Sequence, residues 1–263
     1  MSMRRLSLAI AVALALLAGR AHAHGDSLPF IAFWNPVSMP FAAEVARCQR
    51  VLGEAREQCL SRSMRRTEAC WRSQLDGGSC DEVALAAAIA GAVGDTTPAI
   101  DTACSDAQAR AIYFLNRSEA VTDKDFICTR VPEEIASFLY QPAIAAGWQL
   151  ESEAAACVAR ASAVAVKYLR VVAKQQTRTL DRIAVRPGPP SVINGRINRT
   201  NARVGRIRTA LAASLARDCP TLVELYGRNA IQLLLQVELH AQCAVGAGYI
   251  QSAYACPRGY LPR

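Results

Sequence analysis

Apolar residues recur at helical spacing over long stretches of the chain, most clearly within residues 151–185. Their steps alternate between three and four, which places them along one side of a helix, as in a helical bundle. This series consists of Cys157, Ala161, Val164, Tyr168, Val172, Gln175, Thr179 and Ile183. A second series predicts a last long helix over residues 218–253, with His240 at one of its core positions.

A basic helix is expected between these two, over residues 197–217. It follows a break at residues 187–190, where two prolines and a glycine precede Pro190. Residues 192–197 contain Asn194-Gly195 and are interpreted as a small hairpin or a loop. Residues 146–263 are therefore predicted to form a basic bundle of long antiparallel helices.

The N-terminal half predicts shorter helices. Periodic or apolar segments indicate helices over residues 83–93 and 106–117, and Pro132 with the acids after it resembles the start of another. Residues 41–145 form an acidic, Cys-rich helical region, expected to be continuous with the bundle. The prediction is an all-α, disulfide-stapled helical bundle with shorter Cys-rich helices in its N-terminal half.

The first 40 residues predict an export signal and an arm. Arg4 and Arg5 precede a short apolar stretch, and small residues follow it, so residues 1–23 have the pattern of a signal peptide. Cleavage is expected before His24 or before His22. Prolines and aromatics make residues 24–40 an extended arm that packs on the body or docks on another protein. No later stretch is long and apolar enough to predict a membrane span.

Ten cysteines follow the predicted signal, and an even number in an exported chain predicts up to five disulfides. They are Cys48, Cys59, Cys70, Cys80, Cys104, Cys128, Cys157, Cys219, Cys243 and Cys256. Export places the protein in the periplasm or outside the cell.

The first three cysteines are spaced by 11 residues, which permits two arrangements. One continuous helix would stack all three on one face. A break within residues 61–66 would instead make a hairpin of Cys48-x10-Cys59 and Cys70-x9-Cys80, which resembles the twin-CX9C helical hairpin. That resemblance implies the pairs Cys48–Cys80 and Cys59–Cys70.

Charge is unequally divided along the chain, whose formal net charge is +8. Residues 24–157 carry a net charge of −7 and residues 158–263 carry +12. In the long helices the basic residues repeat every three or four positions and predict an anionic-surface contact. They are Arg170, Lys174, Arg178, Arg182, Arg199, Arg203 and Arg206. The alternative is a solvated face neutralised by the acidic half of the same or another protomer.

Several partners fit this charge pattern. A protein partner, self-association through opposite charges, or an anionic envelope surface all satisfy it. Nucleic acid is disfavoured, because aromatic side chains that would stack on bases are not interleaved with the arginines.

Two N-terminal motifs suggest chemistry. Cleavage before His24 would leave its amine and imidazole at the N-terminus as copper ligands. Cleavage before His22 would give His22-Ala23-His24, which resembles the amino-terminal copper- and nickel-binding motif.

Gly25-Asp26-Ser27-Leu28 spells the signature of the GDSL lipases and esterases, in which Ser27 would be the nucleophile. The other blocks of that family are missing.

The leading functional hypothesis is an exported, non-catalytic helical protein that acts through protein–protein or envelope-surface contacts, as a component of an envelope, secretion or conjugation assembly. It requires no cofactor. A copper-binding protein with His24 as ligand is the alternative, and a hydrolase using Ser27 is a third. His240, on an apolar stripe and facing away from Glu238, is expected to be a core histidine.

Overall fold

Helices make up nearly all of the computed structural model, which describes residues 41–112, 114–186, 188–246 and 249. Within these residues there are ten helices and no strand. The all-α prediction is therefore confirmed for the described part of the chain. The predicted signal at residues 1–23 and the predicted arm at residues 24–40 lie outside it.

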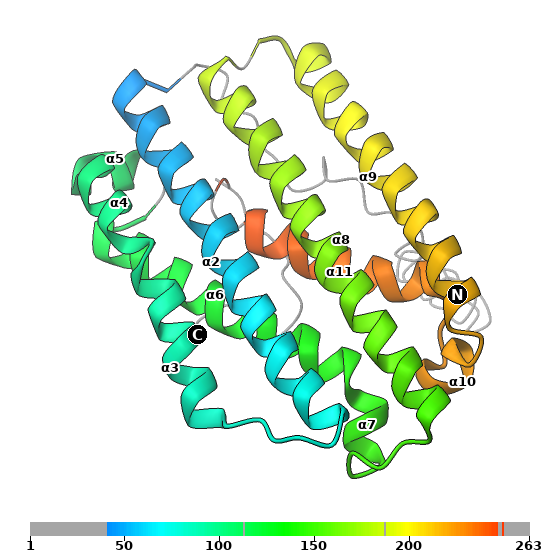
Figure 1. The fold of residues 1–263 in the computed structure, drawn as a ribbon. Coiled ribbons are helices and arrows are strands. Elements are labelled where there is room, and N and C mark those ends of the chain that lie inside the picture. The colour runs from blue at the N-terminus through cyan, green and yellow to red at the C-terminus, as the bar shows by residue number, and fades with distance from the viewer. Residues whose placement is uncertain (1–40, 113, 187, 247–248, 250–263) are drawn as a thin grey trace, which may run out of the picture.

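Three long helices lie side by side in one layer (Figure 1). They are α2 (Ala43–Leu75), α8 (Ser152–Val185) and α9 (Pro190–Asp218). The central helix α8 runs antiparallel to both neighbours and packs against each of them. Helices α6 (Arg117–Leu139) and α11 (Ala230–Gly246) lie behind this layer and cover its inner face.

Five shorter helices complete the fold. Helices α3 (Glu82–Gly94), α4 (Thr97–Ala103) and α5 (Asp106–Ala111) flank the outer edge of α2, and α7 (Gln141–Ala145) and α10 (Leu222–Tyr226) lie at the opposite end from the α8–α9 turn. The main apolar core takes residues from both halves of the sequence, from Cys59 on α2 to Val245 on α11. The acidic and basic regions of the sequence thus share one core.

Helix α8 has the bounds that its apolar series predicts, to within one residue. Seven of the eight predicted positions are buried and Gln175 is half-buried. Removing an apolar side chain of this size from water stabilises the fold by about 1.5–3 kcal/mol. A stripe of this length therefore fixes both the helix and the side that faces the core.

Helix α2 is one continuous helix of 33 residues, so the hairpin interpretation of this segment is wrong. Residues 61–66 contain neither glycine nor proline. Ser61 and Ser63 are buried there, and the Thr67 hydroxyl donates to the Ser63 carbonyl at 3.1 Å, within the helix. Nothing in this segment breaks the helical hydrogen bonding.

The 11-residue spacing places three cysteines of α2 where each reaches a different neighbour. The described disulfides join Cys48 to Cys104, Cys59 to Cys128, Cys70 to Cys80 and Cys157 to Cys219, with Cα atoms 4.8–5.7 Å apart. The implied pairs Cys48–Cys80 and Cys59–Cys70 are therefore wrong.

Of the remaining two cysteines, the structure describes only one. Cys243 is buried on α11 and is not free, and Cys256 lies outside the described residues. No described cysteine is free. Four disulfides indicate an oxidising, exported environment.

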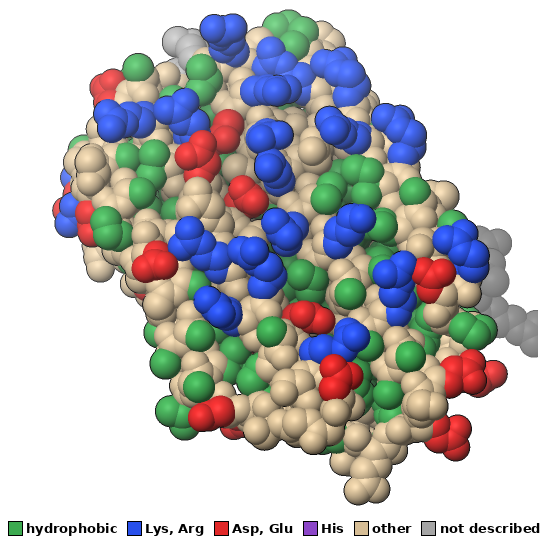
Figure 2. Space-filling model, viewed as in Figure 1, with side chains coloured by type: hydrophobic (Ala, Val, Ile, Leu, Met, Phe, Trp, Pro, Cys, Tyr) green, Lys and Arg blue, Asp and Glu red, His purple; other side chains and the backbone are tan. Residues whose placement is uncertain are grey.

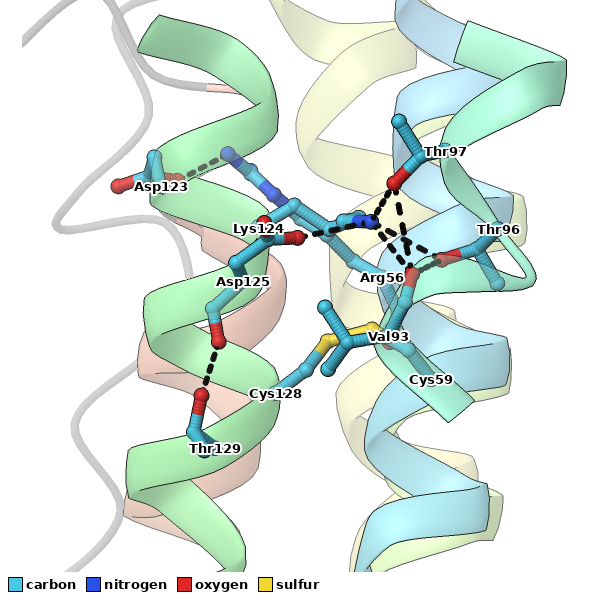
Figure 3. The surroundings of a disulfide bond; sticks show 10 residues. All are labelled: Arg56, Cys59, Val93, Thr96, Thr97, Asp123, Lys124, Asp125, Cys128 and Thr129. Carbon is cyan, nitrogen blue, oxygen red and sulfur yellow. Dashed lines mark hydrogen bonds and ion pairs between the residues drawn. A yellow bond between two sulfur atoms is a disulfide. The ribbon is translucent and has the colours of Figure 1, made fainter. Parts of the chain in front are cut away.

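The Cys59–Cys128 disulfide joins α2 to α6 beside two buried cations (Figure 3). On one side Arg56 forms an ion pair with Asp123. On the other side the amine of Lys124, which is fully buried, donates to the Val93 carbonyl at 2.8 Å. Its other acceptors are the hydroxyls of Thr96 and Thr97, at 3.1 and 2.9 Å, and Asp125 at 2.9 Å. These contacts fix α6 against the end of α3.

Helix α6 begins earlier than predicted and runs through Pro132, so Pro132 does not start a helix. The helix begins instead after Asn116, whose side chain accepts a hydrogen bond from the Glu119 amide at 2.8 Å and caps it. The helix expected over residues 106–117 ends at Ala111. A good N-cap and a continuous buried face outweigh one proline inside the helix.

Helix α9 begins at Pro190, so residues 192–197 are neither hairpin nor loop. Proline suits the first turn of a helix, and Ile193 and Ile197, one turn apart, are buried.

The predicted helix over residues 218–253 is divided into α10 and α11. Gly227 has a positive φ of 61° and ends α10, and the Asn229 side chain, which accepts from the Gln232 amide at 3.0 Å, precedes α11.

One apolar segment differs from the expectation that no later stretch could span a membrane. Residues Glu82–Ala103 are long and apolar enough to cross a membrane by length and composition alone. The segment divides into α3 and α4, with Asp95 and Thr96 between them. A single segment of this kind is weak evidence for a membrane span.

Candidate anion-binding groove

Lysine and arginine side chains gather on the face formed by α2, α8 and α9, called the basic face below (Figure 2). On α8 and α9 all seven predicted residues are exposed: Arg170, Lys174, Arg178, Arg182, Arg199, Arg203 and Arg206. Arg50 of α2 is close enough to act electrostatically on Asp181 of α8. Basic residues of the acidic half thus extend the positive face of α8 and α9.

A groove of about 310 Å³ lies between α8 and α9 on this part of the molecule. Arg178 and Arg182 line it from α8, and Arg196, Arg199 and Arg203 line it from α9. Its other lining residues are Gln175, Thr179 and Thr200. None of these eight residues is acidic or aromatic.

The two threonines hold the helices together beneath the arginines. Their hydroxyl oxygens lie 2.7 Å apart, at hydrogen-bonding distance across the α8–α9 interface. Each hydroxyl also contacts its own helix, Thr179 at the Gln175 carbonyl and Thr200 at the Arg196 carbonyl. The contact between the two hydroxyls holds α8 and α9 close together at this point.

One of the groove arginines is held by backbone carbonyls near it. Arg196 Nη1 donates to the carbonyls of Arg182, at 3.4 Å, and Arg186 in the last turn of α8. A cation at the C-terminal end of α8 opposes the negative end of the helix dipole. The guanidinium group of Arg196 is thus positioned in advance.

The five groove arginines form no ion pair with another described residue, unlike several arginines elsewhere. Arg160, for example, lies 2.6 Å from Asp218, and Arg130 lies 2.9 Å from Glu133. Five like charges that form no ion pair among the described residues create a positive potential that attracts anions. The groove therefore has the charge and hydrogen-bond donors of an anion-binding site.

The predicted surface residues do not all belong to this groove. Arg170 and Lys174 lie instead towards α2, where they and Arg178 act on Glu57. Burial raises the pKa of Glu57, and the three cations lower it in part. Arg206 is exposed on α9 but does not line the groove.

The basic stripes in the sequence indicate four of the groove arginines but not Arg196 or the polar residues around them. Gln175 and Thr179 belong to the series of core positions expected for α8. A signal was present, because the apolar series of α8 becomes polar at Gln175 and Thr179, where the groove begins.

His240 and Glu238 lie close together in the sequence of α11 but have separate surroundings. His240 is buried on α11, and burial lowers its pKa to about 4, so the ring is neutral at pH 7. Glu238 accepts hydrogen bonds from Arg208 at 2.9 Å, from Gln242 at 3.1 Å and from the Tyr168 hydroxyl. These contacts join α8, α9 and α11, and the two residues do not form an acid–base couple.

The N-terminal candidates cannot be placed, since His24 and Ser27 lie outside the described residues. Within the described ranges, no group of three or more His, Cys, Asp or Glu side chains could hold a metal ion. Comparisons of the chain with protein-family models, with curated proteins and with solved structures find no match. Function is therefore inferred from the fold and the basic face.

Proposed function

We propose that the protein is an exported, non-catalytic binding protein that attaches through its basic face to an anionic surface of the cell envelope, from the periplasm or from outside the cell. The observation that carries this proposal is the group of five arginines at the groove between α8 and α9, none of which forms an ion pair with another residue that the structure describes. Their charges lie on a rigid, disulfide-linked layer, so little conformational freedom is lost on contact.

An anionic surface fits better than a nucleic acid or an apolar partner. The lining of the groove offers guanidinium groups, hydroxyls and one amide, without an aromatic ring on which a base could stack. Basic residues near an anionic bilayer each contribute about 1 kcal/mol of attraction, which falls as salt is added. A face carrying several of them supports reversible, salt-dependent attachment.

The test is sedimentation with vesicles of phosphatidylcholine alone or with 30 mol%, a chosen composition, of phosphatidylglycerol. We expect binding to the anionic vesicles only, with an affinity that falls steeply as salt increases. A variant with Arg170→Gln, Lys174→Gln, Arg178→Gln and Arg203→Gln should lose it. The control variant Arg117→Gln with Arg130→Gln removes arginines of α6 that are paired with acids, and should bind normally.

Two outcomes would contradict the proposal. Equal binding to neutral and anionic vesicles would exclude an electrostatic attachment. Equal losses in the basic-face and control variants would show that the basic face has no special part in it. Concentration-dependent self-association that is abolished by the basic-face variant, without vesicle binding, would favour an acidic face of a second copy as the partner.

A further inference from the structure

We infer that the groove between α8 and α9 is a specific site for a group carrying two or three phosphates, such as a phosphorylated headgroup or a free polyphosphate. This inference rests on the proposed anion-binding role of the basic face and adds a ligand class to it. The five arginines Arg178, Arg182, Arg196, Arg199 and Arg203 converge from two helices on one volume of about 310 Å³.

Charge density distinguishes phosphate from carboxylate here. The groove has room for the volume of about ten water molecules. A carboxylate supplies one negative charge, whereas a phosphate monoester supplies about 1.5–2 charges and three acceptor oxygens at pH 7. Two or three phosphates therefore balance five guanidinium groups, whereas carboxylates would need five separate groups to supply the same charge.

The hydrogen-bond donors of the groove also fit phosphate oxygens. A guanidinium group is a planar fork that matches two oxygens of a phosphate, and such charge-assisted pairs are short and strong. Arg196 is already fixed by the carbonyls of Arg182 and Arg186, so its remaining N–H groups have a restricted direction. Gln175 adds a side-chain amide at the edge of the groove.

The lining also limits what carries the phosphates. It contains no aromatic ring to stack on a base and no apolar side chain to accept an acyl chain. A nucleotide would leave its base without a stacking partner, and a lipid would insert its headgroup only. The groove thus selects the phosphates rather than the group that carries them.

The first arm of the test is titration calorimetry of the oxidised protein with tripolyphosphate, with sulfate and citrate as comparison anions. We expect tripolyphosphate to bind at one site, at least tenfold more tightly than either comparison anion. Arg178→Gln with Arg199→Gln should weaken binding by about a hundredfold, at about tenfold for each lost charge-assisted contact. Arg170→Gln with Lys174→Gln removes the same charge outside the groove and should weaken it less than threefold.

A charge-preserving variant distinguishes the effect of the bidentate guanidinium geometry from that of the positive charge. Arg178→Lys with Arg199→Lys keeps both positive charges but removes the bidentate geometry. We expect an intermediate loss, with thermal unfolding unchanged because both side chains are exposed. Full retention of affinity in this variant would overturn the bidentate phosphate assignment.

The second arm identifies the source of the phosphates. Vesicles containing phosphatidic acid, a phosphomonoester, are compared with vesicles of equal surface charge containing phosphatidylglycerol. Preference for phosphatidic acid that is lost in the groove variant and reduced by tripolyphosphate indicates a lipid headgroup. Tight tripolyphosphate binding without this preference indicates a soluble ligand.

Failure of this inference differs from failure of the proposed function. If anionic vesicles bind but tripolyphosphate binds no better than citrate, or binds equally to the groove and control variants, the phosphate site is wrong and the surface attachment stands. If tripolyphosphate binds as expected and no vesicle does, the groove is assigned correctly and the envelope attachment is wrong.

Discussion

The Tyr249 hydroxyl donates a hydrogen bond to Oδ1 of Asp181 across 2.6 Å, which ties the segment after α11 to α8. Burial raises the pKa of Asp181 to about 6, although this hydrogen bond acts in the opposite direction. Glu54 also raises the pKa, and Arg50 lowers it. The carboxylate form is therefore less stable in the folded protein than in water.

This pKa predicts how stability changes with pH. The folded state holds the Asp181 proton more tightly than the unfolded state, so the contribution of Asp181 to the free energy of unfolding is fully present below the unfolded pKa, near 4, and is lost as pH rises through about 6. Asp181→Asn should remove about 1 kcal/mol of this fall, after allowance for partial exposure. Urea unfolding at two pH values, one on each side of this range, measures it.

Glu224→Gln is the control, since Glu224 is exposed on α10. It should leave the pH dependence as in the original protein. An Asp181→Asn variant with the same pH dependence as the original would show that another group is responsible.

Gly53 is required where Tyr249 packs on α2. A Cβ atom at this position would lie within 2 Å of the Tyr249 hydroxyl oxygen, so Gly53→Ala must displace the ring and its hydrogen bond to Asp181. We expect a loss of about 1–3 kcal/mol in the free energy of unfolding. Chemical denaturation measures this loss.

Gly91 of α3 provides the matched substitution. A Cβ atom there meets nothing within 4 Å, so Gly91→Ala should stabilise the helix by about 0.5–1 kcal/mol. The two substitutions add the same methyl group to helical glycines. Effects of the same sign would contradict the packing described for Tyr249.

Lys124 is the connection between α6 and the end of α3. Lys124→Met keeps the length of the buried side chain but leaves the Val93 carbonyl and the hydroxyls of Thr96 and Thr97 without this donor. We expect a loss of about 1–3 kcal/mol in stability and faster hydrogen exchange of the α3 amides. Lys167→Met, on the exposed side of α8, should change neither. Unchanged exchange in the Lys124 variant would mean that other contacts hold α3 in place.

The disulfide pairing is open to direct chemical mapping. Digestion under non-reducing conditions should give linked peptides for Cys48–Cys104, Cys59–Cys128, Cys70–Cys80 and Cys157–Cys219. Mass spectrometry before and after reduction identifies each pair. Peptides that join Cys48 to Cys80 would restore the hairpin interpretation of α2.

The sequence predicts helices best where a periodic stripe of core positions is long. Helix α8 has such a stripe over eight positions and is predicted within one residue. Cysteine spacing alone left α2 ambiguous, because 11 residues suit both a continuous helix and a hairpin. Gly227 divides the last predicted helix because a left-handed turn outweighs an apolar series that continues on both sides.

The arginines of the candidate site follow from periodicity, but the groove does not. The sequence shows that α8 and α9 each carry a basic stripe, without showing which residues of the two stripes face each other. That depends on the packing of α8 against α9 at Thr179 and Thr200, a tertiary contact. For the same reason the exposed Arg170 and Lys174 could not be separated from the groove residues in advance.

Cys157 and Cys219 join the start of α8 to the end of α9, while the chain itself joins the other ends of these helices. Every groove residue lies inside the covalent ring that results. A protease that cuts once within this ring, for example at the exposed turn before Pro190, leaves the two pieces attached through sulfur. A single cleavage within this ring therefore cannot separate the α8 arginines of the groove from those of α9.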